Sequence, residues 1–307
     1  MSKLLLLAVF VIGIGSFPPK MDVQKLTPGR ITLPLWPNGA PGAQPNPKPE
    51  MDTTTAKDDL VAGKPVIRLG NVSTPTLTFY AAHGKNSGAA VVVFPGGAYQ
   101  ILAMDLEGTE VCEWLTSAGI NCVLLKYRVP NSGHYPKSSA ALQDAQRAVG
   151  MVRSHAAEWY IDSNRIGVLG FSAGGHLAAS LSTHFDKRLY DPTDAADQLS
   201  CRPDFAVIVY PAYLVAEQNF APDPEIRVTE RTPPSFIVQA ENDPLHVENA
   251  TVYFHALKNA NVPAELHLYA EGGHGYGLRR TDLPVTGWPQ LVETWLHTIR
   301  ILPPSAP

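Results

Sequence analysis

The sequence predicts an α/β fold whose central sheet is mostly parallel. After Leu60, short apolar runs rich in β-branched residues alternate with segments in which apolar residues recur at helical spacing. Several of these runs are apolar at consecutive positions, as expected for strands that helices cover on both faces. The chain of 307 residues is 45% hydrophobic and 17% charged, which is typical of a globular protein with a large core.

The predicted elements follow one another along the chain as alternating strands and helices. The strands are TLTFYAA from Thr76, AAVVVFPGG from Ala89, NCVLLKYRV from Asn121, RIGVLGFS from Arg165, DFAVIVYP from Asp204, SFIVQAEND from Ser235 and AELHLYAEGGH from Ala264. The helices are GTEVCEWLTSAG, SSAALQDAQRAVGMVRSHAAEWY, SAGGHLAASLSTHF, VENATVYFHALKNA and PQLVETWLHTIR. This order predicts one α/β domain over residues 61–307.

Two segments precede this domain, a predicted signal peptide at residues 1–15 and an arm at 16–60. In the first, a lysine precedes an apolar run from Leu4 to Ile14, and small residues follow. We therefore expect a secreted or periplasmic protein, with an uncleaved N-terminal anchor as the alternative. In the arm, residues 33–50 repeat proline, glycine and asparagine, which exclude a helix or an interior strand and predict an extended surface segment.

The net charge limits the class of molecule that the protein is expected to bind. The net charge is −4 without a long run of either sign, so there is no basic footprint for nucleic acid, and a small molecule or a neutral polymer fits better as a partner.

Cys112 and Cys122 fall in a predicted helix and the strand after it, which permits a disulfide, although three buried free thiols including Cys201 are the alternative. None of the three has metal-ligand spacing.

The stretch VLGFSAGGH at residues 168–176 carries the first chemical signal. Ser172 lies at the end of a predicted strand and at the start of a predicted helix, as a nucleophile elbow requires. Gly170 and Gly174 permit the close packing that such a turn needs. A tight glycine-bracketed turn without chemistry is the alternative interpretation.

An acid and a histidine follow the serine in the required chain order. Asp243 lies on the loop after SFIVQA, where catalytic groups of parallel sheets gather, although it could serve only as a turn or cap residue. Glu241 is the second candidate acid. His274 is flanked by glycines that let the backbone bring its imidazole over the sheet edge. His176 lies one helical turn beyond Ser172, and we expect it to pack beside the elbow.

Backbone amides complete the candidate site. In VVVFPGGAYQ a strand opens into a glycine-rich turn, where Gly97 and Ala98 could each present an N–H to an oxyanion. Ala173, directly after Ser172, would supply another.

These motifs together resemble the α/β-hydrolase superfamily from about Pro65 onward. FPGGAY resembles the oxyanion loop of lipases and esterases, with Pro95 in place of histidine and Ala98 in place of the third glycine. LPLWPNGAPG, LKYRVP, LQDAQRAV and NRIGVLGFSAGGHLAA resemble secreted bacterial acetyl and feruloyl esterases of the acetylxylan-esterase type. In that branch Asp144 and Arg147 would be structural, and an ion pair between them within the helix is the alternative.

The resemblance implies a serine esterase that removes short acyl or feruloyl groups from plant polysaccharide or sugar esters and needs neither a metal nor an organic cofactor. The segment at about 215–232 predicts only a small polar cap. A prolyl-oligopeptidase-like peptidase is the enzymatic alternative, although about 60 residues cannot build the propeller that precedes such domains. A non-catalytic hydrolase-fold binding protein is the other alternative.

Overall fold

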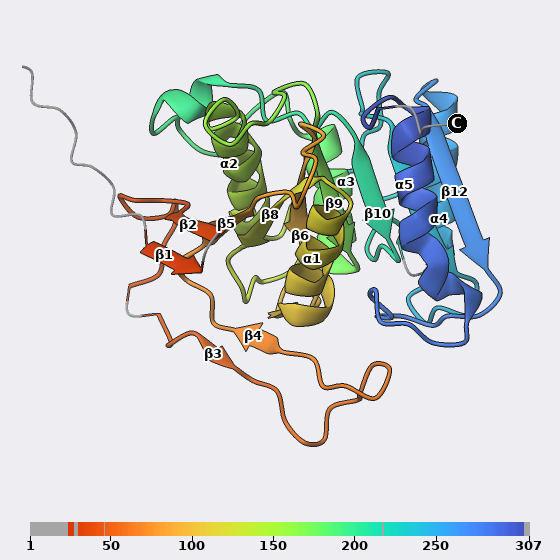
Figure 1. The fold of residues 1–307 in the computed structure, drawn as a ribbon. Helices are drawn as coiled ribbons and strands as arrows, with labels where there is room; N and C mark the ends of the chain where they lie inside the picture. Colours follow the sequence, from red (N-terminus) through yellow and green to blue (C-terminus); the bar gives the residue numbers. More distant parts are fainter. Residues whose placement is uncertain (1–23, 28–29, 46, 217, 304–307) are drawn as a thin grey trace, which may run out of the picture.

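The computed structural model describes residues 24–27, 30–45, 47–216 and 218–303, so the predicted signal peptide lies outside the described residues. Within these residues a nine-stranded sheet has the order β1-β2-β5-β8-β6-β9-β10-β11-β12 (Figure 1). Its strands are β1 (Gln24–Thr27), β2 (Arg30–Pro34), β5 (Thr76–Tyr80), β6 (Ala90–Phe94), β8 (Asn121–Lys126), β9 (Ile166–Phe171), β10 (Ala206–Val209), β11 (Ser235–Ala240) and β12 (Ala264–Tyr269). The part from β8 to β12 is parallel, whereas β1, β2 and β5 pair antiparallel.

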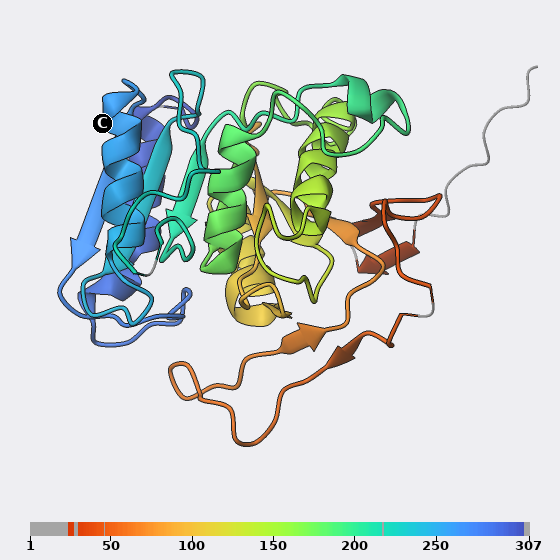
Figure 2. The same ribbon diagram turned by 180° about the vertical axis from the view of Figure 1, so that it is seen from behind.

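Helices cover both faces of this sheet, as Figures 1 and 2 show from opposite sides. The helices are α1 (Glu110–Ser117), α2 (Ala140–Ser154), α3 (Ala173–Thr183), α4 (Glu248–Asn259) and α5 (Trp288–Thr298). Residues of α2, α3 and α4 belong to one buried apolar cluster, and residues of α1 and α5 belong to a second. Alternate residues of β6 enter the two clusters, with Val92 in the first and Val93 in the second. This double burial is why the central strands read as continuous apolar runs.

The predicted fold class is confirmed. All seven predicted strands and five predicted helices occur, joined by a π-helical turn at Asp105–Thr109 and 3₁₀ turns at Ala195–Gln198 and Pro284–Gly287. The helix predicted to reach Tyr160 ends at Ser154, and the chain continues in turns to Tyr160, whose φ is +55°. A left-handed residue of this kind cannot continue a right-handed helix.

The arm differs from its prediction. Residues 33–50 were expected to lie on the surface without an interior strand, but Leu33 and Pro34 belong to β2, which lies between β1 and β5. The next two side chains, Leu35 and Trp36, are buried in the core. Pro34 is tolerated because it is the last residue of the strand, where the missing N–H costs least.

Buried polar groups on α2 hold this arm in place. Trp36 Nε1 donates to Asp144 Oδ1 at 2.7 Å, and Arg147 Nε donates to Leu35 O at 2.6 Å. Asp144 forms its ion pair with Arg128 at 2.8 Å. Arg147 pairs instead with Asp194 at 2.6 Å and with Asp197 at 2.7 Å. The alternative of a pair between Asp144 and Arg147 is therefore wrong, because each side chain is directed to a different segment.

A second, three-stranded sheet joins the arm to the main body. Its strands are β3 (Met51–Asp52), β4 (Arg68–Gly70) and β7 (Ile101–Ala103), in antiparallel order β3-β4-β7. In Figure 1 the chain between β3 and β4 runs below the main sheet, at the end to which the β12 arrow points. Arg279 fastens this stretch, since Nη1 donates to Lys64 O at 3.0 Å and to Pro65 O at 2.8 Å.

The structure also shows which of the three cysteines are bonded to each other. Cys112 and Cys122 form a disulfide, and Cys201 is a buried free thiol.

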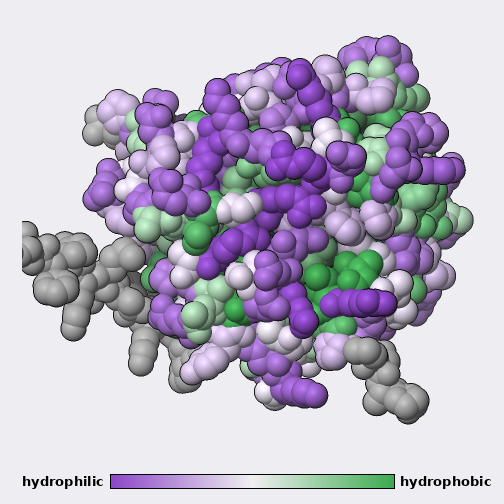
Figure 3. All heavy atoms as spheres, turned by 90° about the horizontal axis from the view of Figure 1, so that it is seen from above, coloured by the Kyte–Doolittle hydropathy of each residue, from purple (hydrophilic) through white to green (hydrophobic). Residues whose placement is uncertain are grey.

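Among the described helices, none is both long and apolar enough to cross a bilayer. The face at the amino ends of the parallel strands carries mostly hydrophilic residues, with hydrophobic patches between them (Figure 3).

Candidate active site

Ser172 lies on the turn that joins β9 to α3, as predicted. Its φ of +52° and ψ of −118° are strained for a residue with a side chain, and such strain is typical of functional turns. The flanking glycines make the turn possible, because a Cβ on Gly170 would come within 2.0 Å of Gly174 O and one on Gly174 within 2.1 Å of Phe94 O. The serine hydroxyl is thereby held at the carboxyl end of the parallel strands.

The structure brings the predicted serine, histidine and aspartate together. His274 Nε2 lies 2.8 Å from Ser172 Oγ, and His274 Nδ1 lies 2.8 Å from Asp243 Oδ2. The Asp243 side chain is fully buried, whereas that of His274 is 21% exposed. Leu245 N–H donates to Asp243 Oδ1 at 2.8 Å, which fixes the carboxylate. The arrangement can remove a proton from the serine and hold the imidazole in one tautomer.

The competing residues take other positions. Glu241 is exposed, and Asp243 is the acid that contacts His274. His176 is buried beside the elbow, as expected, where its Nδ1 lies 2.8 Å from the Tyr99 hydroxyl. Burial lowers the pKa of His176 well below its ordinary value, with smaller contributions from His134 and His184, so its imidazole is neutral.

The predicted oxyanion loop is a tight turn over residues 97–100. Gly97 has φ +127°, and Ala98 and Tyr99 have φ of +54° and +58°. Gln100 N–H donates to Gly97 O at 2.8 Å, which closes the turn. Among the described residues, the N–H groups of Gly97, Ala98 and Ala173 donate to no acceptor. Backbone amides without partners can receive a developing negative charge.

Tyr99 holds this unusual turn. Left-handed backbone at a tyrosine costs on the order of 1–3 kcal/mol, so surrounding contacts must determine it. The Tyr99 side chain is buried and hydrogen-bonded to His176, and its carbonyl accepts Asn131 N–H at 2.8 Å. His176 thus supports the oxyanion loop from α3.

Glu107 and Tyr210 are functional candidates that the sequence analysis did not identify. The buried Glu107 carboxyl accepts Gly96 N–H at 2.7 Å and the Tyr210 hydroxyl at 2.8 Å. The Tyr210 hydroxyl also accepts Gly277 N–H at 3.1 Å, and the Tyr210 ring lies 4.9 Å from that of His274. Burial raises the pKa of Glu107, an effect that these hydrogen bonds partly offset. Only the tertiary contacts reveal this link between the oxyanion and histidine loops.

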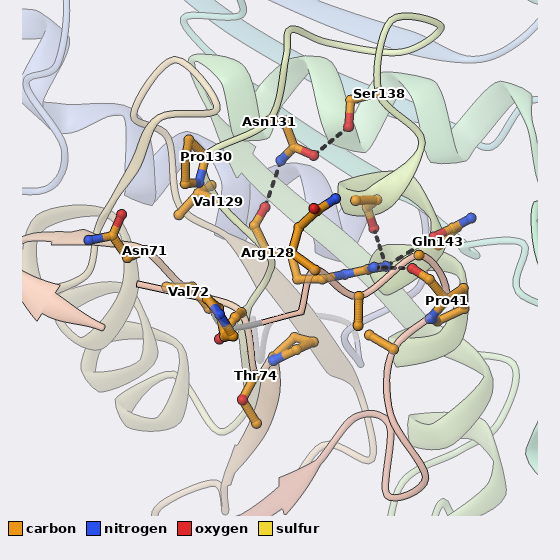
Figure 4. A pocket seen from close by; sticks show the side chains of 18 of the residues that line it. Pro41, Asn71, Val72, Thr74, Arg128, Val129, Pro130, Asn131, Ser138 and Gln143 are labelled. Atoms are coloured by element: carbon orange, nitrogen blue, oxygen red, sulfur yellow. Dashed lines mark hydrogen bonds between the residues drawn. The ribbon is translucent and has the colours of Figure 1, made fainter. Parts of the chain in front are cut away.

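A separate cavity of about 950 Å³ lies between the arm and the segment from Arg128 to Gln143 (Figure 4). Ser172, His274 and Asp243 do not line this cavity. Asn131 connects the two regions, because its side chain bonds Arg128 O and Ser138 Oγ in the cavity wall while its N–H bonds Tyr99 O in the oxyanion loop.

Comparisons with known proteins identify relatives of this chain. The family model described as BD-FAE matches residues 77–209, from β5 to β10. The acetylxylan esterase of Xylanibacter ruminicola is 30% identical, over 62% of this chain and 42% of that protein. Endo-1,4-beta-xylanase B of Butyrivibrio fibrisolvens is 28% identical, over 70% of this chain and 36% of that protein. The chain therefore spans less than half the length of these two relatives.

Solved structures match over more of their own length. The acetyl ester-xyloside bifunctional hydrolase from Caldicellulosiruptor lactoaceticus is 38% identical with a TM-score of 0.67, over 76% of this chain and 90% of that one. MGS-M1, an alpha/beta hydrolase from a Medee basin deep-sea metagenome library, is 26% identical with a TM-score of 0.60, over 81% and 98%.

The mostly parallel sheet and the helices on both of its faces are those of the α/β-hydrolase superfamily. Within that superfamily the chain belongs to the BD-FAE family.

Proposed function

We propose that this protein is a serine carboxylic-ester hydrolase. The observation that carries the proposal is the continuous chain of contacts from Ser172 Oγ through His274 to Asp243, with 2.8 Å at each step. Relatives named as esterases support the same reaction class.

In the proposed mechanism, Ser172 Oγ attacks the acyl carbonyl carbon while His274 Nε2 takes the hydroxyl proton. Asp243 stabilises the resulting imidazolium, and the amides of Gly97, Ala98 and Ala173 receive the oxyanion. The imidazolium then protonates the leaving alcohol, which leaves an acyl group on Ser172. His274 next activates a water molecule that releases the acid and restores the serine. All these groups belong to the chain itself.

We further propose that the substrate carries a short acyl group, acetyl above all, or a feruloyl group on a sugar or plant polysaccharide. The names of the Xylanibacter and Caldicellulosiruptor relatives support an acetylated xylan or xyloside. The small cap also supports it, because the described residues at 215–232 form no helix that would close over a long acyl chain. Secretion into the surroundings or the periplasm, where such polymers occur, stays a prediction from residues 1–15.

The test is hydrolysis of p-nitrophenyl acetate, butyrate and longer-chain esters, together with acetate release from acetylated xylan. Ser172→Ala should remove turnover, whereas the matched surface variant Ser117→Ala should keep the wild-type rate. His274→Ala and Asp243→Asn should each lose several orders of magnitude, because triad members act as a unit. Absence of wild-type activity on every ester would refute the esterase proposal, and full activity of Ser172→Ala would refute the residue assignment.

A further inference from the structure

Three potential metal ligands meet beside the candidate active site. His134 lies on the loop between β8 and α2, His176 on α3, and Asp223 in the cap segment, residues 215–232. One ligand atom from each lies within 4.8 Å of the other two. His134 Nδ1 is 4.0 Å from Asp223 Oδ2, and the His134 and His176 ring centroids are 4.8 Å apart.

The two histidines are held as metal ligands usually are, by hydrogen bonds to a ring nitrogen. The Tyr99 hydroxyl lies 2.8 Å from Nδ1 of His176, so Nε2, which lies 3.5 Å from the Ser180 hydroxyl, is the nitrogen available to a metal ion. His134 Nδ1 contacts Tyr135 O at 2.7 Å, and the His134 ring stacks on Tyr213 at 4.9 Å. Both rings are thus fixed beside the cluster.

The carboxylate completes the set. Asp223 Oδ1 accepts Glu225 N–H at 2.8 Å, and Oδ2 is the atom nearest to His134. Its side chain is only 13% exposed. Two imidazoles and one carboxylate form a donor set that suits Zn²⁺ and leaves a fourth position for water.

We propose that His134, His176 and Asp223 bind one divalent transition-metal ion, Zn²⁺ in chemical type, and that the ion fastens the cap segment to the body of the protein. Ligand atoms around a tetrahedral Zn²⁺ lie roughly 3.3 Å apart, given bonds of about 2.0 Å. The widest separation in the cluster, up to 4.8 Å, must therefore shrink by about 1.5 Å. The cap segment can supply this movement, because its described residues form no helix or strand beyond the isolated bridge between Val215 and Pro222.

The site would act on the entrance to the candidate active site and take no part in the chemical step. His176 follows Ser172 by one helical turn, with its N–H donating to Ser172 O at 3.0 Å. It also bonds Tyr99 of the oxyanion turn. A bound ion would thus connect the cap, α3 and the oxyanion loop. Binding does not depend on esterase activity, so the two proposals can fail separately.

The experiment is a calorimetric titration of the untagged full chain, stripped with EDTA, with ZnCl₂ near neutral pH. We expect one site, weakened at least about 100-fold in His134→Asn and in Asp223→Asn. The control variants are His155→Asn and His267→Asn, because each of these histidines also lies beside a carboxylate, Glu158 and Glu265 respectively. They should bind Zn²⁺ as the wild type does. Circular dichroism checks that each variant is folded.

A second readout concerns the stability that binding supplies. Zn²⁺ should raise the melting temperature of the wild type and of both controls, and should not raise that of Asp223→Asn, whose folding circular dichroism verifies. Co²⁺ in place of Zn²⁺ should give the visible absorption of a tetrahedral site. No binding by the wild type, or unchanged binding by both cluster variants, would overturn the proposal.

Discussion

The buried carboxyl of Glu107 accepts the backbone N–H of Gly96 at 2.7 Å, one residue before the first candidate oxyanion amide. The same carboxyl accepts the Tyr210 hydroxyl at 2.8 Å, and that hydroxyl accepts Gly277 N–H. One side chain therefore positions the oxyanion loop and, through Tyr210, the loop that carries His274.

Glu107→Gln should lower kcat with little change in KM for p-nitrophenyl acetate. The glutamine carbonyl can accept one of the two hydrogen bonds, but its amide then faces the other donor, which costs about 1–3 kcal/mol in a buried site. The part of this cost that falls on the transition state should lower kcat about tenfold. Steady-state kinetics on the folded variant measures it. Unchanged kcat would show that Glu107 only fills space.

Glu107 should also make stability depend on pH. Burial raises its pKa above the ordinary value of 4.5, so in the interval above that value the folded state keeps a proton that the unfolded chain has lost. This contribution to stability is complete below the unfolded pKa and is lost as pH rises through the folded pKa, by up to about 1.4 kcal/mol per pH unit. Urea unfolding of wild type and Glu107→Gln across this range should show their difference changing with pH. A constant difference would contradict the shift.

Gly97→Ala should inactivate the enzyme. The φ of +127° suits only glycine, and the added Cβ would lie 2.2 Å from Ile101 O. The turn must shift, which should remove at least one candidate oxyanion donor and lower kcat about 100-fold or more. Gly84→Ala is the matched control, since Gly84 has φ +65° but nothing within 4 Å of a Cβ. It should keep the wild-type rate at a stability cost of about 1 kcal/mol. Equal effects of both variants would disprove the steric argument.

Asp144→Asn should loosen the arm. The change leaves Arg128 without its buried partner and weakens the acceptor of Trp36 Nε1, at a cost of about 3–5 kcal/mol in unfolding free energy. Urea unfolding measures the loss, and limited proteolysis should cut residues 37–50 faster than in the wild type. Glu158→Gln, in an exposed pair with His155, should cost less than about 1 kcal/mol. If Asp144→Asn resisted the protease as well as the wild type does, this would contradict the role of Asp144 in holding the arm.

The disulfide determines how many thiols should react in each state of the protein. Unfolded, unreduced protein should show one reactive thiol, Cys201, and reduction should expose all three, because Cys112 and Cys122 are paired. In the native protein Cys201 should resist alkylation, since it is buried and burial raises the pKa of its thiol. Ellman's reagent measures each state. Three thiols without reductant would show that the disulfide is absent.

The local pattern of the sequence determined much of the fold. Continuous apolar runs identified the central strands because helices cover both faces of the sheet there. The order of serine, acid and histidine identified three side chains that lie in contact, although Ser172 and His274 are 102 residues apart. Motif and chain order suffice in such a case because the topology of a parallel sheet brings its loops to one edge.

The tertiary structure alone decided the choice between Asp243 and Glu241, the entry of β2 into the main sheet and the separate partners of Asp144 and Arg147. It also revealed the contacts of Glu107 and the meeting of His134, His176 and Asp223. These features depend on side chains from distant segments that approach one another only after the core has packed. No spacing in the sequence encodes such an approach, since loop path and burial determine which polar groups face each other.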